Sequence, residues 1–173
     1  MKFTTLIVTV LATTSLFAQQ VTKKEIAGIS TFAQVETTIA CGGATKPEAI
    51  REIAKMGFKS VINLRLASEQ GAMVEEEGAA VKAAGMNYVH LPFDAQNPDA
   101  HLIDNFIAAV TAPANQPAYV HCAAGGRAAS LWMVKRVLAD GWEREGEERE
   151  YFLRFSPDAY SVGIDVLLYA LTH

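Results

Sequence analysis

One stretch constrains this chain more than any other. An apolar run that ends in Tyr119, Val120 and His121 leads into Cys122, small residues follow, and Arg127 opens a helical pattern. A strand that feeds a helix N-terminus through a glycine-rich loop builds an anion site from backbone N–H groups and the helix dipole. A cysteine at the mouth of such a site is activated, because its thiolate is itself an anion. The stretch therefore predicts a strand–loop–helix unit that binds an oxyanion beside a nucleophilic sulfur.

The composition is that of an ordinary single globular domain. The chain has 173 residues, of which 50% are hydrophobic and 20% charged. A formal net charge of −4 argues against a nucleic-acid or anionic-membrane partner. With Cys41 and Cys122 as the two cysteines, no disulfide framework is expected. The spacing of His, Cys, Asp and Glu predicts no metal site, and we expect no cofactor.

The first eighteen residues have the layout of a secretory signal peptide. Lys2 supplies a positive charge, and residues 3–17 form an apolar, threonine-rich run that is short for a spanning helix. Cleavage is expected after Ala18, and an uncleaved N-terminal anchor is the alternative. We therefore expect residues 19–173 to form one exported domain, periplasmic or secreted, without stable membrane association after cleavage.

The remaining chain alternates strand-like apolar runs with helical patterns. Strands are expected at 32–40, 58–66, 86–93 and 118–121, and helices at 45–56, 74–84, 98–111, 127–139, 143–155 and 157–171. Thr45 is the expected cap of the first helix. This order predicts an α/β fold with a mainly parallel four- to five-stranded sheet, helices on both faces and an all-helical C-terminal end.

Several reactive or polar side chains come at or just after the carboxyl ends of the expected strands. They are Cys41, Arg65, Asp94 and Cys122. Ligands of open parallel sheets bind at that edge, so we expect these groups to converge on one site. Arg65 either lines the site or pairs with Glu69. Asp94 is either a functional acid or a turn residue, and Cys41 is either a packing residue or a redox partner of Cys122.

The loop after Cys122 is free of bulk. It consists of Ala123, Ala124, Gly125 and Gly126. Backbone N–H groups of such a loop can surround a tetrahedral anion, and both glycines permit positive φ angles. Arg127 can donate two parallel hydrogen bonds to anion oxygens. His121 is expected to hydrogen-bond loop backbone and hold the loop in shape.

This stretch resembles the signature loop of cysteine-dependent protein phosphatases, in which His-Cys precedes a glycine-containing loop and an arginine. The resemblance covers roughly residues 32–140. Residues 60–65 are similar to the second strand of small bacterial members, and residues 92–96 to their general-acid loop. The segment 42–47 resembles the beta-lactamase-hydrolase-like phosphatase subfamily.

The resemblance implies a phosphocysteine mechanism without metal, acting on a phosphorylated substrate. In that mechanism Cys122 attacks the phosphoryl group and Arg127 binds its oxygens. Asp94 protonates the leaving alkoxide and later activates water. His121, Arg65 and the four loop residues complete the expected substrate-binding set.

Two features of the loop differ from the usual phosphatase pattern, which has five residues between cysteine and arginine and a serine or threonine after the arginine. Here four residues separate Cys122 from Arg127, and Ala128 follows. Four is the loop size of rhodanese-type sulfurtransferases, whose cysteine carries a persulfide, although the small bacterial phosphatase-like subfamily is close to this spacing. A phosphatase is thus the leading hypothesis. A sulfurtransferase and a catalytically degenerate oxyanion-binding module are the alternatives.

Overall fold

The computed structural model describes residues 21–94, 96, 99 and 101–141. The expected signal peptide and the two expected helices at 143–155 and 157–171 lie outside these residues. The elements within them are β1 (Thr22–Lys23), β2 (Phe32–Glu36), β3 (Ile39–Gly42), η1 (Pro47–Ala49), α1 (Ile50–Lys55), β4 (Ser60–Asn63), α2 (Val74–Ala83), β5 (Asn87–His90), α3 (Leu102–Thr111), η2 (Pro113–Asn115), β6 (Ala118–His121) and α4 (Gly126–Asp140). None of these helices is long and apolar enough to cross a membrane.

The strands form one sheet in the order β1-β2-β3-β6-β4-β5. β3, β6, β4 and β5 run parallel, while β1 and β2 add an antiparallel edge. The predicted mainly parallel sheet is confirmed, with six strands rather than four to five. β6 lies between β3 and β4, so Cys122 leaves the sheet from an inner strand.

The single strand expected at 32–40 is in fact two strands. β2 and β3 form an antiparallel hairpin that turns at Thr37 and Thr38, with a register irregularity between Gln34 and Glu36. The turn contains neither glycine nor proline, and apolar residues continue on both sides of it. The apolar pattern therefore gave no signal of the break.

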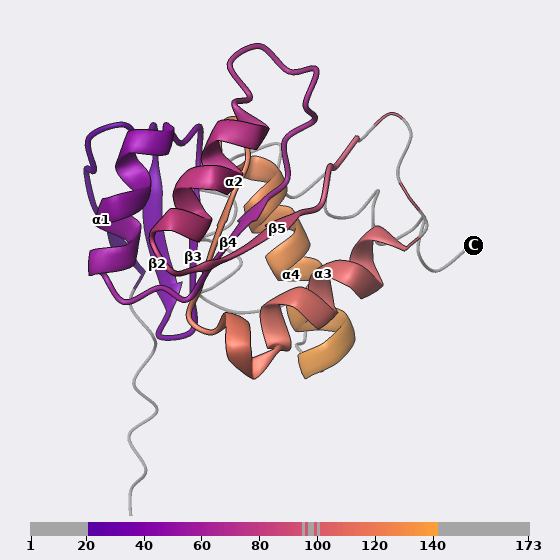
Figure 1. Ribbon diagram of the computed structural model, residues 1–173. Helices are drawn as coiled ribbons and strands as arrows, with labels where there is room; N and C mark the ends of the chain where they lie inside the picture. The colour runs from indigo at the N-terminus through magenta and orange to yellow at the C-terminus, as the bar shows by residue number, and fades with distance from the viewer. Residues whose placement is uncertain (1–20, 95, 97–98, 100, 142–173) are drawn as a thin grey trace, which may run out of the picture.

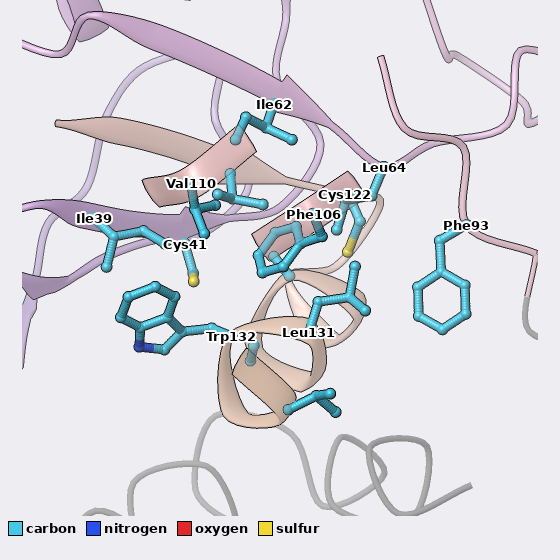
Figure 2. Packing of buried hydrophobic residues seen from close by; sticks show 14 of the residues in the cluster. Ile39, Cys41, Ile62, Leu64, Phe93, Phe106, Val110, Cys122, Leu131 and Trp132 are labelled. Atoms are coloured by element: carbon cyan, nitrogen blue, oxygen red, sulfur yellow. The ribbon is translucent and has the colours of Figure 1, made fainter. Parts of the chain in front are cut away.

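Helices cover both faces of the sheet, as predicted (Figure 1). On one face, Val61 and Tyr119 pack with Ile50 of α1 and Val81 of α2. On the other face, strand residues such as Ile62 and Val120 pack with α3 and α4. Figure 2 shows this second core, where Phe106 of α3 and Leu131 and Trp132 of α4 lie beneath the strands. Neighbouring residues of one strand thus belong to different cores.

Tyr119 anchors the first of these cores. Its fully buried ring stacks on Phe32 at a centroid distance of 5.7 Å and on His121 at 5.6 Å. Its hydroxyl donates to Oγ1 of Thr45 at 2.8 Å, because the Thr45 hydroxyl donates in turn to the carbonyl of Gly43. Thr45 is therefore not the helix cap that the sequence predicted. Its side chain is committed to Tyr119, and η1 begins after Lys46 without a side-chain cap.

We expect Gly42→Ala to destabilise the protein, because a Cβ at this position would overlap the hydroxyl and ring of the buried Tyr119. Overpacking of this kind costs about 1–3 kcal/mol of unfolding free energy, measurable by urea denaturation. Tyr119→Phe alone should cost about 1 kcal/mol through its lost hydrogen bond. The Tyr119 hydroxyl is the nearest atom to the added methyl. The double variant Gly42→Ala/Tyr119→Phe should therefore lose less unfolding free energy than the two single variants together. If the two losses are strictly additive, the added methyl does not meet the Tyr119 hydroxyl.

Candidate active site

The candidate site lies at the carboxyl ends of β4 and β6. Cys122 follows β6 directly, and its N–H donates to the carbonyl of Gly42 at the end of β3, at 3.2 Å. Leu64 follows β4, and its N–H donates to the carbonyl of His121 at 2.9 Å. The loops that leave the central strands are therefore fixed to one another where the chain turns away from the sheet.

Cys122 is held at the base of the loop, with 2% of its surface exposed. The N–H of Gly125 donates to its Sγ at 3.1 Å. Gly125 adopts a φ of +94°, as required to turn the chain into α4. Gly126, which would also permit a positive φ, does not use one, because it is already the first residue of the helix.

Loop peptides are oriented by the neighbouring loop after β3. The N–H of Ala44 donates to the carbonyl of Ala123 at 2.8 Å. The peptide that joins Ala123 to Ala124 is trans and planar, so the N–H of Ala124 points away from Ala44, opposite to the Ala123 carbonyl. Within the described residues, no backbone hydrogen bond uses the N–H groups of Ala123 or Ala124. Together with the first turn of α4, these N–H groups form the kind of donor set that the sequence predicted for an anion, and anion binding itself stays a prediction.

Both terminal nitrogens of the Arg127 guanidinium are held by hydrogen bonds. Its Nη1 donates to the carbonyls of Leu64 at 3.2 Å and Phe93 at 2.9 Å, and to Oε1 of Glu69 at 2.6 Å. Its Nη2 donates to Oε2 of Glu69 at 2.8 Å. Burial alone would lower the pKa of Arg127, but the hydrogen bond to Glu69 and the adjacent Cys122 raise it. None of the hydrogen bonds among the described residues uses Nε, and the guanidinium adjoins Cys122, so it can still donate to anion oxygens.

Glu69 is a site residue that sequence analysis treated only as a partner of Arg65. Partial burial raises its pKa, but hydrogen bonds from Arg127, the N–H of Leu66 and Arg65 together bring the pKa down to about 2. Glu69 is therefore a permanent carboxylate and cannot serve as a general acid. Its contact with Arg127 is long-range, so no local pattern indicated it.

Arg65 supports this arrangement rather than lining the anion loop. Its guanidinium donates to Glu69 and to the carbonyls of Gln70 and Gly71, at 2.7 to 3.3 Å. It is buried, and these contacts turn it into the loop that carries Glu69. Of the two alternatives left by the sequence, pairing with Glu69 is the one that the geometry shows.

Asp94 follows an anchored residue. Phe93 has a buried side chain, its N–H donates to the carbonyl of Leu64 at 3.0 Å, and its carbonyl accepts from Arg127. The half-buried Asp94 therefore starts its loop from the same residue that fixes the arginine. Its Oδ1 accepts the N–H of Gln96 at 2.9 Å, which is the geometry of an Asx turn. Asp99 makes a similar contact with the N–H of His101 and is exposed.

His121 does not bond the loop backbone as predicted. Its Nε2 lies 2.8 Å from Oε1 of Glu77 on α2, and both side chains are buried. The amide of Asn63 donates to the second oxygen of Glu77 at 3.3 Å. A signal for Glu77 existed in the sequence, because it occupies the apolar stripe of its helix with Val74 and Val81. A charged residue on that stripe has to find a buried partner.

Cys41 is a packing residue in the same core as Cys122, where it lies near Ile39 and Trp132 (Figure 2). It is paired in register with Val120, two residues before Cys122 on the neighbouring parallel strand. Strand spacing and rise then put the two cysteine Cα atoms about 8 Å apart, which exceeds disulfide reach. Both thiols are free, and burial, together with the nearby Cys122, raises the pKa of Cys41.

These features define a class of protein. An inner parallel strand that ends in a cysteine, an anion-binding loop and an arginine in the first helical turn constitute a protein-tyrosine-phosphatase-like domain. Residues 31–139 match the phosphatase-like domain of beta-lactamase hydrolase-like proteins, and the chain belongs to that family. No protein of curated function matches the sequence.

Solved structures agree with this assignment. A phosphatase candidate from Shewanella putrefaciens is 25% identical, with a TM-score of 0.64 over 82% of this chain and 89% of that one. The catalytic core of the PP-IP phosphatase SIW14 from S. cerevisiae is 22% identical, with a TM-score of 0.61 over 76% and 82%. TpbA from P. aeruginosa is 16% identical, with a TM-score of 0.58 over 82% and 89%. The last two similarities concern the fold.

Glu69→Gln should remove a pH-dependent part of the stability. The pKa of Glu69 in the folded protein is about 2, below its ordinary value of 4.5, so its contribution is complete above pH 4.5 and disappears as the pH falls toward 2. Because the group is partly exposed, we expect a loss of about 1–2 kcal/mol at pH 6 that narrows at acidic pH. Unfolding free energies from pH 6 to 2 measure this.

Glu52→Gln is the matched control, since Glu52 pairs with Lys55 on the exposed surface of α1. Its unfolding free energy should follow the wild-type curve throughout the series. If the unfolding free energies of wild type and Glu69→Gln change in parallel with pH, Glu69 is not held as a carboxylate by Arg127.

Proposed function

We propose that this protein hydrolyses a phosphomonoester through a phosphocysteine intermediate on Cys122. The observation that carries the proposal is the arrangement of Arg127. Its guanidinium is fixed by Glu69, Leu64 and Phe93, and it adjoins Cys122, while the N–H groups of Ala123 and Ala124 form no backbone hydrogen bond within the described residues. Such a preorganised set of donors stabilises the charge that develops on a transferring phosphoryl group.

In the first step, the Cys122 thiolate attacks phosphorus and forms an S–P bond. The bond from phosphorus to the leaving oxygen breaks, and Asp94 donates a proton to that oxygen. In the second step, Asp94 accepts a proton from a water molecule that attacks phosphorus. The S–P bond then breaks, which returns the thiolate and releases inorganic phosphate. Arg127 binds two equatorial oxygens during both steps.

A sulfurtransferase is the second candidate, and the spacing of four residues between Cys122 and Arg127 favours it. In that reaction the thiolate takes the outer sulfur of thiosulfate, sulfite leaves, and a nucleophile such as cyanide removes the sulfur from the persulfide. The phosphatase-like family supports the first candidate over the second. The two reactions share the nucleophile, so substrate assays separate them.

The phosphatase proposal predicts that the protein hydrolyses an aryl phosphate and that Cys122→Ser loses this activity. Removal of a covalent nucleophile should lower kcat by at least about a thousandfold. Cys41→Ala is the matched control, because it removes the other buried thiol and should keep the activity. Wild-type thiosulfate-to-cyanide transfer without phosphate release would instead select the sulfurtransferase. Unchanged phosphate release by Cys122→Ser would reject the phosphocysteine.

Asp94→Asn should lower the rate of hydrolysis more, the more basic the leaving group of the substrate is. General-acid catalysis contributes about 100- to 10,000-fold, so an alkyl phosphate should lose most of its rate. An aryl phosphate with an acidic phenol needs less protonation and should lose less. Asp99→Asn is the matched control, since its carboxylate caps a neighbouring backbone N–H on the exposed side of the same loop. Equal losses for both substrates in Asp94→Asn would exclude Asp94 as the acid.

A further inference from the structure

The loops around Cys122 contain few cations that a substrate could use. From residue 83 to residue 126 the sequence has no lysine or arginine. This stretch includes β5, the loop of Asp94, α3, β6 and the cysteine loop. The preceding cation, Lys82, lies in the last turn of α2, at the end of the sheet opposite Cys122. Positive charge near Cys122 must therefore come from a small number of residues.

Two arginines lie near Cys122, and one carboxylate is shared between them. The side chain of Arg65 is 6% exposed and donates to Glu69 and to two backbone carbonyls. Arg127 is 19% exposed, donates to both oxygens of Glu69 and adjoins Cys122. With one carboxylate between two guanidiniums, the arrangement keeps a single net positive charge. Arg127 is the guanidinium that can offer this charge to a phosphoryl group.

Acidic side chains follow on the β5 side of the site. Asp94 is half-buried, and Asp99 is exposed in the same loop. The segments 64–73 and 91–101 contain no lysine or arginine besides Arg65. A second phosphate group that extends to this side would therefore meet acidic residues without a cation to compensate it, which costs free energy in a partly buried setting.

On the other side, the loop after β3 contains one lysine, Lys46. Its N–H donates to the carbonyl of Gly28 at 2.8 Å. Its Cβ and Cδ lie 3.6 and 3.9 Å from the point where a side chain on Gly28 would begin. The stem of Lys46 thus packs on the turn before β2, while the cysteine loop is contacted by the backbone of Ala44 instead. Lys46 is the exposed cation to test as a second anion partner.

We propose that the site selects a substrate with a single phosphate ester on an uncharged or positively charged carrier, and discriminates against carriers with further phosphate or carboxylate groups. The inference rests on the proposed phosphatase reaction, and part of its test depends on anion binding alone. Arg127 and the loop N–H groups can compensate one phosphoryl group. Cationic groups on the carrier would instead be attracted by the acidic loop of Asp94 and Asp99, which raises the rate of productive encounter.

The test compares two phosphotyrosyl peptides that differ only in the residues flanking the phosphate, lysines in one and glutamates in the other. At low ionic strength, kcat/KM of the full chain should favour the lysine peptide by about tenfold. The ratio should fall toward one as salt rises from about 20 to about 500 mM, because salt screens the interaction. Equal kcat/KM values for the two peptides, or a preference for the glutamate peptide, overturn the proposal.

Two variants with the same change of charge locate the origin of the preference. Gln70→Lys adds a cation at an exposed position beside Glu69, and keeps the backbone carbonyl that Arg65 uses. It should lower the ratio of the two peptides by about threefold. Ala114→Lys adds the same charge at an exposed position of η2, at the end of the sheet opposite Cys122, and should keep the wild-type ratio. No reduction in a folded Gln70→Lys, or an equal reduction in both variants, overturns the proposal.

Protection of Cys122 from iodoacetamide tests the selectivity without any turnover. In a Cys41→Ala background, which leaves Cys122 as the one thiol, inositol hexakisphosphate should protect no better than inorganic phosphate at equal concentration. Stronger protection by the hexakisphosphate overturns the proposal, and its loss in Lys46→Gln would identify Lys46 as the second anion partner.

The outcomes also separate this inference from the proposed reaction. If neither peptide is hydrolysed, but inorganic phosphate protects Cys122 more than the hexakisphosphate does, the phosphatase is rejected and the selectivity for one phosphate group is supported. If both peptides are hydrolysed with equal kcat/KM, the phosphatase stands and the selectivity is rejected. If neither anion protects Cys122 and neither peptide is hydrolysed, the site holds no phosphate group and both proposals are rejected.

Discussion

The alternation of side chains along β6 determines how the candidate site is built. Tyr119 and His121 point to the face covered by α1 and α2, while Val120 and Cys122 point to the face covered by α3 and α4. Cys122 and the residue before it are thus in separate environments on opposite faces of one strand. The loop of Cys122 can be shaped by α4 and Arg127, while charge on the other face is arranged independently by α2.

Arg127 joins segments that are far apart in sequence. Its donors end on the carbonyl after β4, on the carbonyl before Asp94 and on Glu69. The residue that would bind phosphoryl oxygens is therefore the same residue that fixes the start of the general-acid loop. A shift of the guanidinium would displace both, so the proposed oxyanion binding and proton donation would be structurally coupled. Arg65 also donates to Glu69, so it helps to hold in place the carboxylate that fixes Arg127.

The sequence was sufficient for features that depend on neighbours along the chain. The strand, the small loop and the helix from Tyr119 onward are predicted correctly, because the pattern and the positions of glycine act locally. The hairpin of β2 and β3 was missed, since its turn carries no glycine or proline. The partners of Arg127 and His121 are set by tertiary packing, which no local pattern contains. Alternation along β6 places His121 and Cys122 on opposite faces of the sheet, which is why His121 does not bond the cysteine loop as predicted.

Two carboxylates near an anion-binding loop present an apparent contradiction, because each should repel a phosphoryl group. Each carboxylate has buried or half-buried partners: Glu69 accepts from Arg127 and Arg65, and Glu77 contacts Nε2 of His121 and the amide of Asn63. Arg127 adjoins Cys122 as well as Glu69, so the negative charge of Glu69 is compensated by a cation at the site itself. A guanidinium without such a partner would keep rotational freedom and lose that freedom on binding an anion. Glu69 therefore fixes the direction of the Arg127 guanidinium, and the site gains preorganisation in exchange for part of its net charge.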